Sequence, residues 1–308
     1  SATLVDGTAS KVAVYDLSFR SINAIGERNR QSAHLSRFSH TVGTTFAEIS
    51  FKIDVRKTAA VGTDDAYTDL LRACGMYFTT NVYGVTSVQS AHKTLTMYAF
   101  IGTNGAACVR RGIRGAAGNV RFVGNVGERA VLEFTFLGVH ETADVDATPA
   151  NTFALKPTDD ALNAVSHEAG IALPFMGVAL TYDSLSVVVP TFTFDLGNEV
   201  VMRESVSSSA GGLHACIVNR KPMIEIDPDS ELVATKNYFG NFNLGTEVAV
   251  GWAYAVSTSR TWTFAASKCQ IEDAQTTDSN GIMKVGLKLA CNRSAEGTGD
   301  AEFTITES

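Results

Sequence analysis

The sequence predicts a mainly β protein with a few short helices. Three segments carry this prediction, because each places an apolar residue at every second position: Ala47–Arg56, Phe192–Leu196 and Met283–Asn292. Alternation with a period of two is typical of a strand that buries one face and leaves the other polar. The same reasoning predicts further strands at residues 11–19, 95–101, 106–114, 118–123, 215–226, 247–256, 261–272 and 301–306.

Two short helices are predicted between these strands. The first lies in "TDDAYTDLLRACG", with Thr63 as its N-cap, Gly75 as its stop and an apolar stripe of Ala66, Tyr67, Leu70, Leu71 and Cys74. The second lies in "DPDSELVATKNYFG", with Asp227 or Asp229 as cap, Gly240 as stop, and Leu232, Val233 and Phe239 facing inward. Helices this short are marginal alone in water, so each is expected to pack on a sheet.

The length and the order of these elements predict two domains. The chain has 308 residues, which exceeds the usual domain size of roughly 100–200 residues. In both halves a strand leads into the helix, two strands follow, and a charged turn opens a strongly alternating strand. We therefore expect a first domain at residues 1–140, a linker at 141–176 with a helical turn near Thr158–Val165, and a duplicated second domain at 177–308.

Composition excludes several classes of protein. With 45% hydrophobic and 19% charged residues and no apolar run near the roughly 18 residues that span a bilayer, we expect a soluble protein without a membrane segment. The five cysteines include no CxxC pair, and no secretory signal is visible, which favours free thiols and assembly in a reducing cytoplasm. The net charge of −7 argues against tight binding of nucleic acid, which needs clustered basic residues.

No motif in the chain indicates catalysis. The six histidines form no HExxH motif, "GIRGAAG" matches neither GxGxxG nor a Walker loop, and "GTTFAEIS" holds no serine between glycines. We therefore expect no enzyme activity, no metal and no cofactor. Trp252 and Trp262 lie inside strand patterns, which predicts a core role rather than an exposed aromatic platform.

An ordered set of motifs resembles a known family. The first half carries "FAEISFKIDV", "YTDLLRACGM", "KTLTMYAFIG" and "RGIRGAAGNVRFVGNVGERAVLEFTFLG", and the second carries "PTFTFDLGNEVVMRESV", "CIVNRKPMIEIDP" and "GIMKVGLKLACN". Over nearly its full length the chain is similar to double-domain tail tube proteins, the major tail proteins of long-tailed, siphovirus-type bacteriophages.

The resemblance implies a fold and a function. It implies two tandem tail-tube-type domains, each a β-sandwich or rolled barrel with one flanking α-helix, and it makes the hairpin Arg114–Gly138 part of a wall. Three copies would form a trimeric, pseudo-hexameric ring, and rings would stack head to tail into a hollow tube in the virion. The implied partners are other copies, the tape measure protein and DNA in the lumen, and tail tip and terminator proteins.

Two oppositely charged segments are the candidates for self-assembly contacts. The loop 26–40 has a net charge of +2 and the connector 139–168 a net charge of −5, so one could meet the other in the next ring. The residues concerned are Arg28, Arg30, Arg37, Glu141, Asp144, Asp146, Asp159 and Asp160. The simpler interpretation of both segments, which we favour, is that they are solvated loops. The alternative function is a receptor- or glycan-binding β module of a phage tail.

Overall fold

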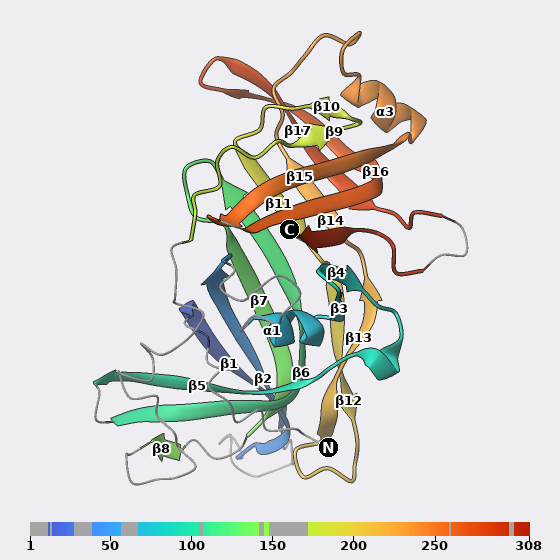
Figure 1. Cartoon of the computed structure of the whole chain (residues 1–308). Helices are drawn as coiled ribbons and strands as arrows, with labels where there is room; N and C mark the ends of the chain where they lie inside the picture. Colours follow the sequence, from blue (N-terminus) through green and yellow to red (C-terminus); the bar gives the residue numbers. More distant parts are fainter. Residues whose placement is uncertain are drawn as a thin grey trace, which may run out of the picture.

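The computed structural model is an elongated molecule built around one long, twisted sheet (Figure 1). It describes residues 12, 14–27, 39–56, 67–104, 107–141, 145–147, 172–258, 260–295 and 299–308. We call the described residues up to 147 the first half and those from 172 the second half. Within these ranges, no helix has the length and apolar character needed to cross a bilayer.

The first half contains eight strands and one α-helix in its described residues. In chain order they are β1 (Tyr15–Gly26), β2 (Thr41–Asp54), α1 (Thr68–Ala73), β3 (Met76–Thr79), β4 (Val82–Val85), the 3-10 turn η2 (Gln89–Ala91), β5 (Leu95–Asn104), β6 (Ala107–Asn125), β7 (Val131–His140) and β8 (Val145–Ala147).

The second half follows a similar plan with an additional hairpin. Its elements are β9 (Thr181–Tyr182), β10 (Leu185–Ser186), β11 (Thr191–Asp195), β12 (Asn198–Glu204), β13 (Gly212–Arg220), β14 (Met223–Ile226), α3 (Tyr238–Leu244), β15 (Glu247–Ser257), β16 (Arg260–Ser279), β17 (Ile282–Cys291) and β18 (Thr304–Glu307). The β12–β13 hairpin forms a separate two-stranded sheet.

The strand order contains the same arrangement twice. The main path runs β1-β2-β7-β6-β11-β14-β17-β16-β15-β9-β10, and β5 pairs with β6 beside that path. The strand order is therefore β1-β2-β7-β6-β5 in the first half and β11-β14-β17-β16-β15 in the second half. The short strand after each alternating strand also matches, because β8 pairs with β6 and β18 pairs with β16. All of these pairings are antiparallel.

The mainly β prediction is confirmed, but several strand limits differ: β1 spans Tyr15–Gly26 rather than 11–19, and β16 continues to Ser279 rather than ending at 272. The strands expected at 106–114 and 118–123 are one strand, β6, because a bulge between Arg114 and Ala117 lets the pairing with β7 continue. Gly115 adopts φ +58° in this bulge, a conformation that favours glycine. The strand expected at 215–226 is two strands, since the turn at Lys221–Pro222 separates β13 from β14.

The first helix agrees with its prediction in its apolar stripe and its stop, and the second helix does not agree. Tyr67, Leu70, Leu71 and Cys74 are buried, and Gly75 ends the turn with φ +77°. The helix begins at Thr68 with Tyr67 at its N-cap, and the predicted cap Thr63 and stripe residue Ala66 lie outside the described residues. The second helix begins at Tyr238, because the Asn237 side chain caps the Gly240 amide at 2.8 Å. Leu232, Val233 and Phe239 are consequently exposed, and the helix ends at Gly245, which has φ +63°.

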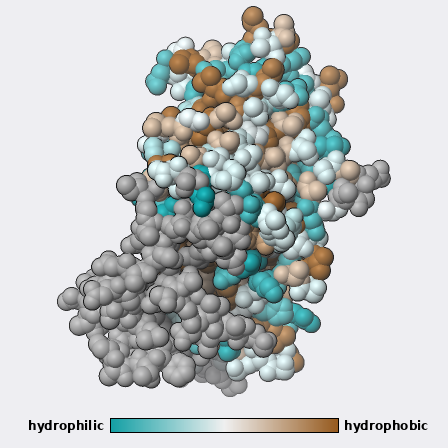
Figure 2. Space-filling model, in the orientation of Figure 1, coloured by the Kyte–Doolittle hydropathy of each residue, from teal (hydrophilic) through white to brown (hydrophobic). Residues whose placement is uncertain are grey.

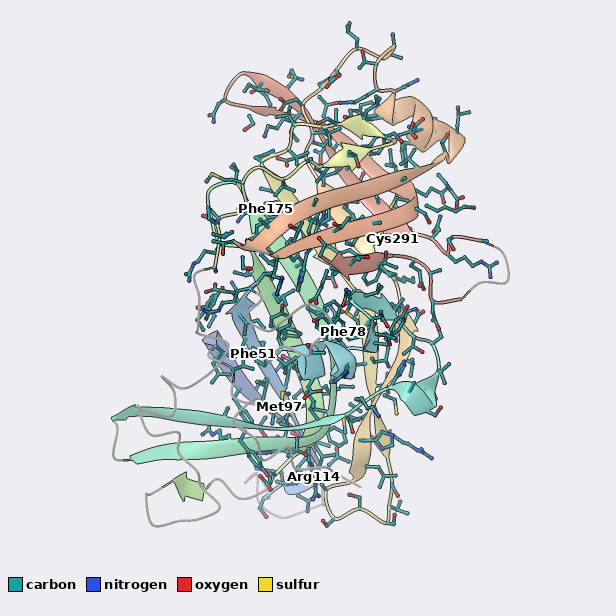
Figure 3. The ribbon with its side chains drawn as sticks, in the orientation of Figure 1. Phe51, Phe78, Met97, Arg114, Phe175 and Cys291 are labelled. Atoms are coloured by element: carbon teal, nitrogen blue, oxygen red, sulfur yellow. The ribbon has the colours of Figure 1, made fainter. Side chains whose placement is uncertain are left out.

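One large hydrophobic cluster runs through both halves. Its centre is aromatic, with Trp252 stacked on Phe122 of the first half at 5.2 Å and on Phe264 at 5.6 Å between ring centroids. Phe175, which lies where the halves meet (Figure 3), packs edge-on against Phe122 at 5.8 Å. Trp252 and Trp262 are 3% and 1% exposed, which confirms their predicted core role.

Candidate self-assembly surfaces

The two halves are joined by strand addition. Within the chain, β11 pairs with the last part of β6, from Asp195 opposite Arg121 to Thr191 opposite Asn125. Backbone hydrogen bonds extend the pairing at both ends, from Leu196 N–H to the Val120 carbonyl and from Val126 N–H to the Pro190 carbonyl. Even-numbered residues of β6 therefore direct their backbone groups toward β11.

A polar cluster fixes the register of this joint. The Asn119 side-chain amide donates to Asp195 at 2.7 Å, and the Asn119 oxygen accepts from the Asn198 amide at 3.0 Å. The Asn198 side chain donates in turn to the carbonyls of Cys74 and Gly118, at 2.7 and 2.9 Å. These partners come from β6, β11, β12 and the end of α1. Hydrogen bonds of fixed direction at such a junction disfavour a shifted register.

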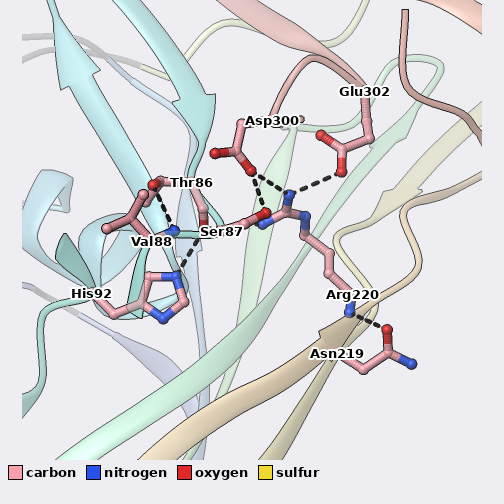
Figure 4. A network of polar contacts seen from close by, with 8 residues as sticks. All are labelled: Thr86, Ser87, Val88, His92, Asn219, Arg220, Asp300 and Glu302. Carbon is pink, nitrogen blue, oxygen red and sulfur yellow. Dashed lines mark hydrogen bonds and ion pairs between the residues drawn. The ribbon is translucent and has the colours of Figure 1, made fainter. Parts of the chain in front are cut away.

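A second joint lies at the C-terminal strand, where β18 pairs with β4 and with β16. Beside it, Arg220 donates to Glu302 at 2.9 Å, to Asp300 at 3.4 Å and to the Thr86 carbonyl at 3.3 Å (Figure 4). Ser87 also donates to Asp300. The Arg220 side chain is only 10% exposed, so this network ties three distant segments in a partly desolvated position.

The network around Arg220 makes the stability of the fold depend on pH in the acidic range. Burial alone would raise the pKa of Asp300, but the hydrogen bonds from Ser87 and Arg220 lower it below its usual 3.8. A carboxylate with a lowered folded-state pKa stabilises the fold above its unfolded pKa, and the contribution is lost as the pH falls through the folded value. Asp300→Asn should therefore lower the urea midpoint at pH 6, and the gap to the parent should shrink below about pH 3.

Asparagine suits this test because Asp300 has φ +63°, which asparagine tolerates. The matched control is Glu272→Gln, on the exposed side of β16, which should leave the midpoint unchanged at both pH values. A gap of equal size at pH 6 and pH 3 would contradict the assignment.

Several strand edges lack a partner within the described residues, among them those of β5 and β10, and two other open edges correspond to the strands that meet in the β6–β11 joint. One is the outer edge of β1, the first strand of the path. The other is the last part of β16, because β15 pairs with β16 only as far as Gln270 and β18 only from Trp262 to Ala265. Unpaired edges of this length are sites at which another strand can add.

The direction of the backbone groups on β16 can be worked out from its neighbour. Val285 donates its N–H to the Pro228 carbonyl, on the side of β17 away from β16. Thr276 lies opposite Val285, so the two form a non-hydrogen-bonded pair and Thr276 directs its N–H to the open edge. Thr277, the next residue, directs its N–H toward β17.

One face of the sheet carries a row of alternating charges. Lys52 contacts Asp16 at 3.3 Å and Glu133 at 3.2 Å, Arg121 contacts Glu133 at 3.5 Å and Glu225 at 3.8 Å, and Lys288 contacts Glu225 at 3.1 Å. We call these six residues the charge ladder. It crosses β1, β2, β7, β6, β14 and β17. Each basic group has an acidic neighbour, so the ladder is electrically balanced.

Exposed apolar side chains gather at the end of the second half. Leu232, Val233 and Leu244 are 78%, 70% and 82% exposed. Leu185 and Phe239 lie near them, since Lys236 links the segment before α3 to the Ser186 carbonyl at 2.6 Å. We call these five residues the end patch. Figure 2 shows hydrophobic residues at this upper end of the molecule. Clustered exposed apolar groups mark interaction surfaces.

Most of the charged residues predicted to mediate assembly lie outside the described residues. Arg28, Arg30, Arg37, Asp144, Asp159 and Asp160 lie outside the described residues, as does Thr158–Val165. Glu141 follows β7 and donates its amide to Gly112 at 2.9 Å, and Asp146 is in β8 opposite Val109. The proposed contact between loop and connector stays a prediction.

No cluster of histidine, cysteine and acidic side chains suited to a metal ion occurs in the part of the chain that the structure describes. The "GIRGAAG" segment forms the β6 bulge and a close approach to β7, where a Cβ on Gly118 would lie 2.5 Å from the Thr135 carbonyl oxygen.

Comparison with known proteins leaves the family unassigned: no protein-family model matches the sequence, and no curated protein matches it. The function is therefore inferred from the open edges, the charge ladder and the end patch.

Proposed function

We propose that this chain is a structural subunit that assembles into rings and stacks them into the hollow tail tube of a bacteriophage. The observation that carries the proposal is the strand addition of β11 to β6 between two halves with the same strand order. The first strand in the order of each half, β1 or β11, lies at one edge of that half. The joint between β6 and β11 is a template for a joint between copies.

The joint between β6 and β11 predicts which two strand edges would pair between copies. Phe134 and Leu287 occupy corresponding positions in β7 and β17, and they pair with Val120 and Ala274. Thr276 thus corresponds to Phe122, which pairs with Phe194 of β11. The corresponding partner for the open edge of β16 is β1 of a second copy. This contact is heterologous, and a heterologous contact gives a ring when the rotation between copies closes; closure with three chains would give pseudo-sixfold symmetry.

The end patch supports the same arrangement. In the first half, α1 is buried and Tyr67 beside it contacts Trp262 of the second half at 5.9 Å between ring centroids. The corresponding helix α3 is at the free end of the second half, with apolar side chains exposed. A neighbouring copy would cover α3 as the second half covers α1, and burial of these side chains would favour association.

The charge ladder suits a surface along which DNA slides. In a closed ring, one face of the sheet lines the lumen, and we assign that role to the face with the ladder because the other face holds the core. Lys52, Arg121 and Lys288 already have acidic partners, so a passing phosphate gains little from them. The paired charges and the net charge of −7 would both keep the lumen from binding DNA tightly.

The proposal is tested by negative-stain electron microscopy of the concentrated protein, with light scattering for the mass of the smallest soluble species. We expect rings or hollow tubes and a species of roughly 100 kDa, the mass of three chains. A species that stays monomeric at every concentration would contradict self-assembly and favour a receptor- or glycan-binding module. With both tryptophans buried, nothing in the described residues specifically favours that second function.

A further inference from the structure

Two cysteines face each other in the core of the second half. Cys269 of β16 and Cys291 of β17 are direct cross-strand partners, and their sulfur atoms are 3.9 Å apart. They are 0% and 5% exposed. Among the described cysteines, Cys74 and Cys216 have no such contact with a second sulfur in the structure. The pair lies at the end of β17, where Figure 3 labels Cys291.

The backbone at this position has the geometry that a disulfide needs. Asn292 donates its N–H to the Lys268 carbonyl at 2.7 Å, and Cys291 donates to Pro222 on the opposite side. Cys269 and Cys291 are therefore a non-hydrogen-bonded pair, for which the Cα atoms lie about 4.5 Å apart. Disulfides span Cα distances of roughly 4.4–6.8 Å. Rotation of the side chains alone can bring the two sulfur atoms into bonding distance.

We propose that Cys269 and Cys291 are a redox-active pair that closes to an intrachain disulfide when the protein meets a peroxide. One thiolate attacks a peroxide oxygen, the O–O bond breaks, and the sulfur becomes a sulfenic acid while hydroxide leaves. The second thiolate attacks that sulfur, the S–O bond breaks, and a second hydroxide leaves. The two protons released by the thiols convert both hydroxides to water. The peroxide receives two electrons and the cysteine pair loses them. This inference does not depend on the proposed function.

The cross-link would close the β16–β17 hairpin at the end opposite its turn. The turn at Asn280–Gly281 already holds one end, with φ +57° and +82°, and the disulfide would hold the other. The open edge of β16 lies between these two points. A closed hairpin has less freedom in the unfolded chain, which stabilises the fold.

The environment of the pair predicts slow oxidation at neutral pH. The hydrogen bond with Cys269, followed by burial, raises the pKa of the Cys291 thiol well above its usual range. The thiolate is the reactive form, so its fraction and the oxidation rate should rise about tenfold per pH unit.

The test uses the full chain treated with hydrogen peroxide and digested without reduction. We expect a cross-linked peptide pair containing Cys269 and Cys291, lighter by two hydrogen atoms and separated by a thiol reductant. The oxidised protein should melt roughly 5 °C higher than the reduced protein. Cys291→Ala should remove both effects, whereas the matched variant Cys74→Ala, at another buried cysteine, should retain them.

If Cys269 and Cys291 remain free thiols while other cysteines oxidise, or if the link joins two chains, the pair is not an intrachain redox site. Peptide mapping of the parent chain decides this even if a variant fails to fold.

Discussion

Thr276→Pro should abolish ring and tube formation while leaving the monomer folded. Thr276 directs its N–H to the open edge of β16, where the corresponding residue of β6 accepts β11. Proline removes that donor and places its ring against the incoming strand, and proline is tolerated in sheets mainly at edges. The free energy of unfolding should change by no more than about 1 kcal/mol. Light scattering and electron microscopy measure assembly, and urea unfolding measures stability.

Two further variants make the experiment specific to the open edge. Thr276→Val keeps the N–H and should assemble normally. Thr277→Pro removes an N–H directed toward β17, opposite Lys284, and should instead destabilise the fold of the monomer. Normal tubes from Thr276→Pro would show that β16 does not receive a strand, and the proposed ring joint would then be wrong.

The sequence predicts best the elements whose signal is local. The strands β2 and β17 follow from strict alternation, since one face of each meets the core and the other does not. The helix α1 follows from its apolar stripe and from Gly75. The second helix differs from its prediction because the same segment offers several capping residues, and the Asn237 side chain, rather than Asp227 or Asp229, accepts from the Gly240 amide of the first turn.

The candidate assembly surfaces could not be found in the same way. The charge ladder joins residues as far apart in the chain as Asp16 and Lys288, and only strand register brings such residues onto one face. The pairing of β11 with β6 is also between segments far apart in the chain. The residue pattern of an edge strand does not indicate which strand it will pair with. The division into two domains stays a prediction, although the sheet and one hydrophobic cluster run through both halves.

Trp252→Ala should lower the free energy of unfolding by about 4 kcal/mol, the range typical of a large aromatic removed from a core. Trp252 is 3% exposed and contacts the rings of Phe122, Phe192 and Phe264. Phe122 belongs to the first half, so the cavity would weaken the contact between the halves. Urea unfolding followed by circular dichroism measures the loss, and Phe242→Ala, at an exposed position of α3, should change stability by less than about 0.5 kcal/mol.

Hydrogen exchange of the same variant tests whether the halves unfold together. Because the cluster around Trp252 includes residues from both halves, global unfolding should become easier for the amides of β2 and β7 as well as for those of β15 and β16. Protection lost only in the second half would mean that the first half is an independent folding unit. In that case, strand addition between β6 and β11 would be a docking contact between two stable domains. A loss shared by both halves would mean instead that the joint is part of one cooperative core.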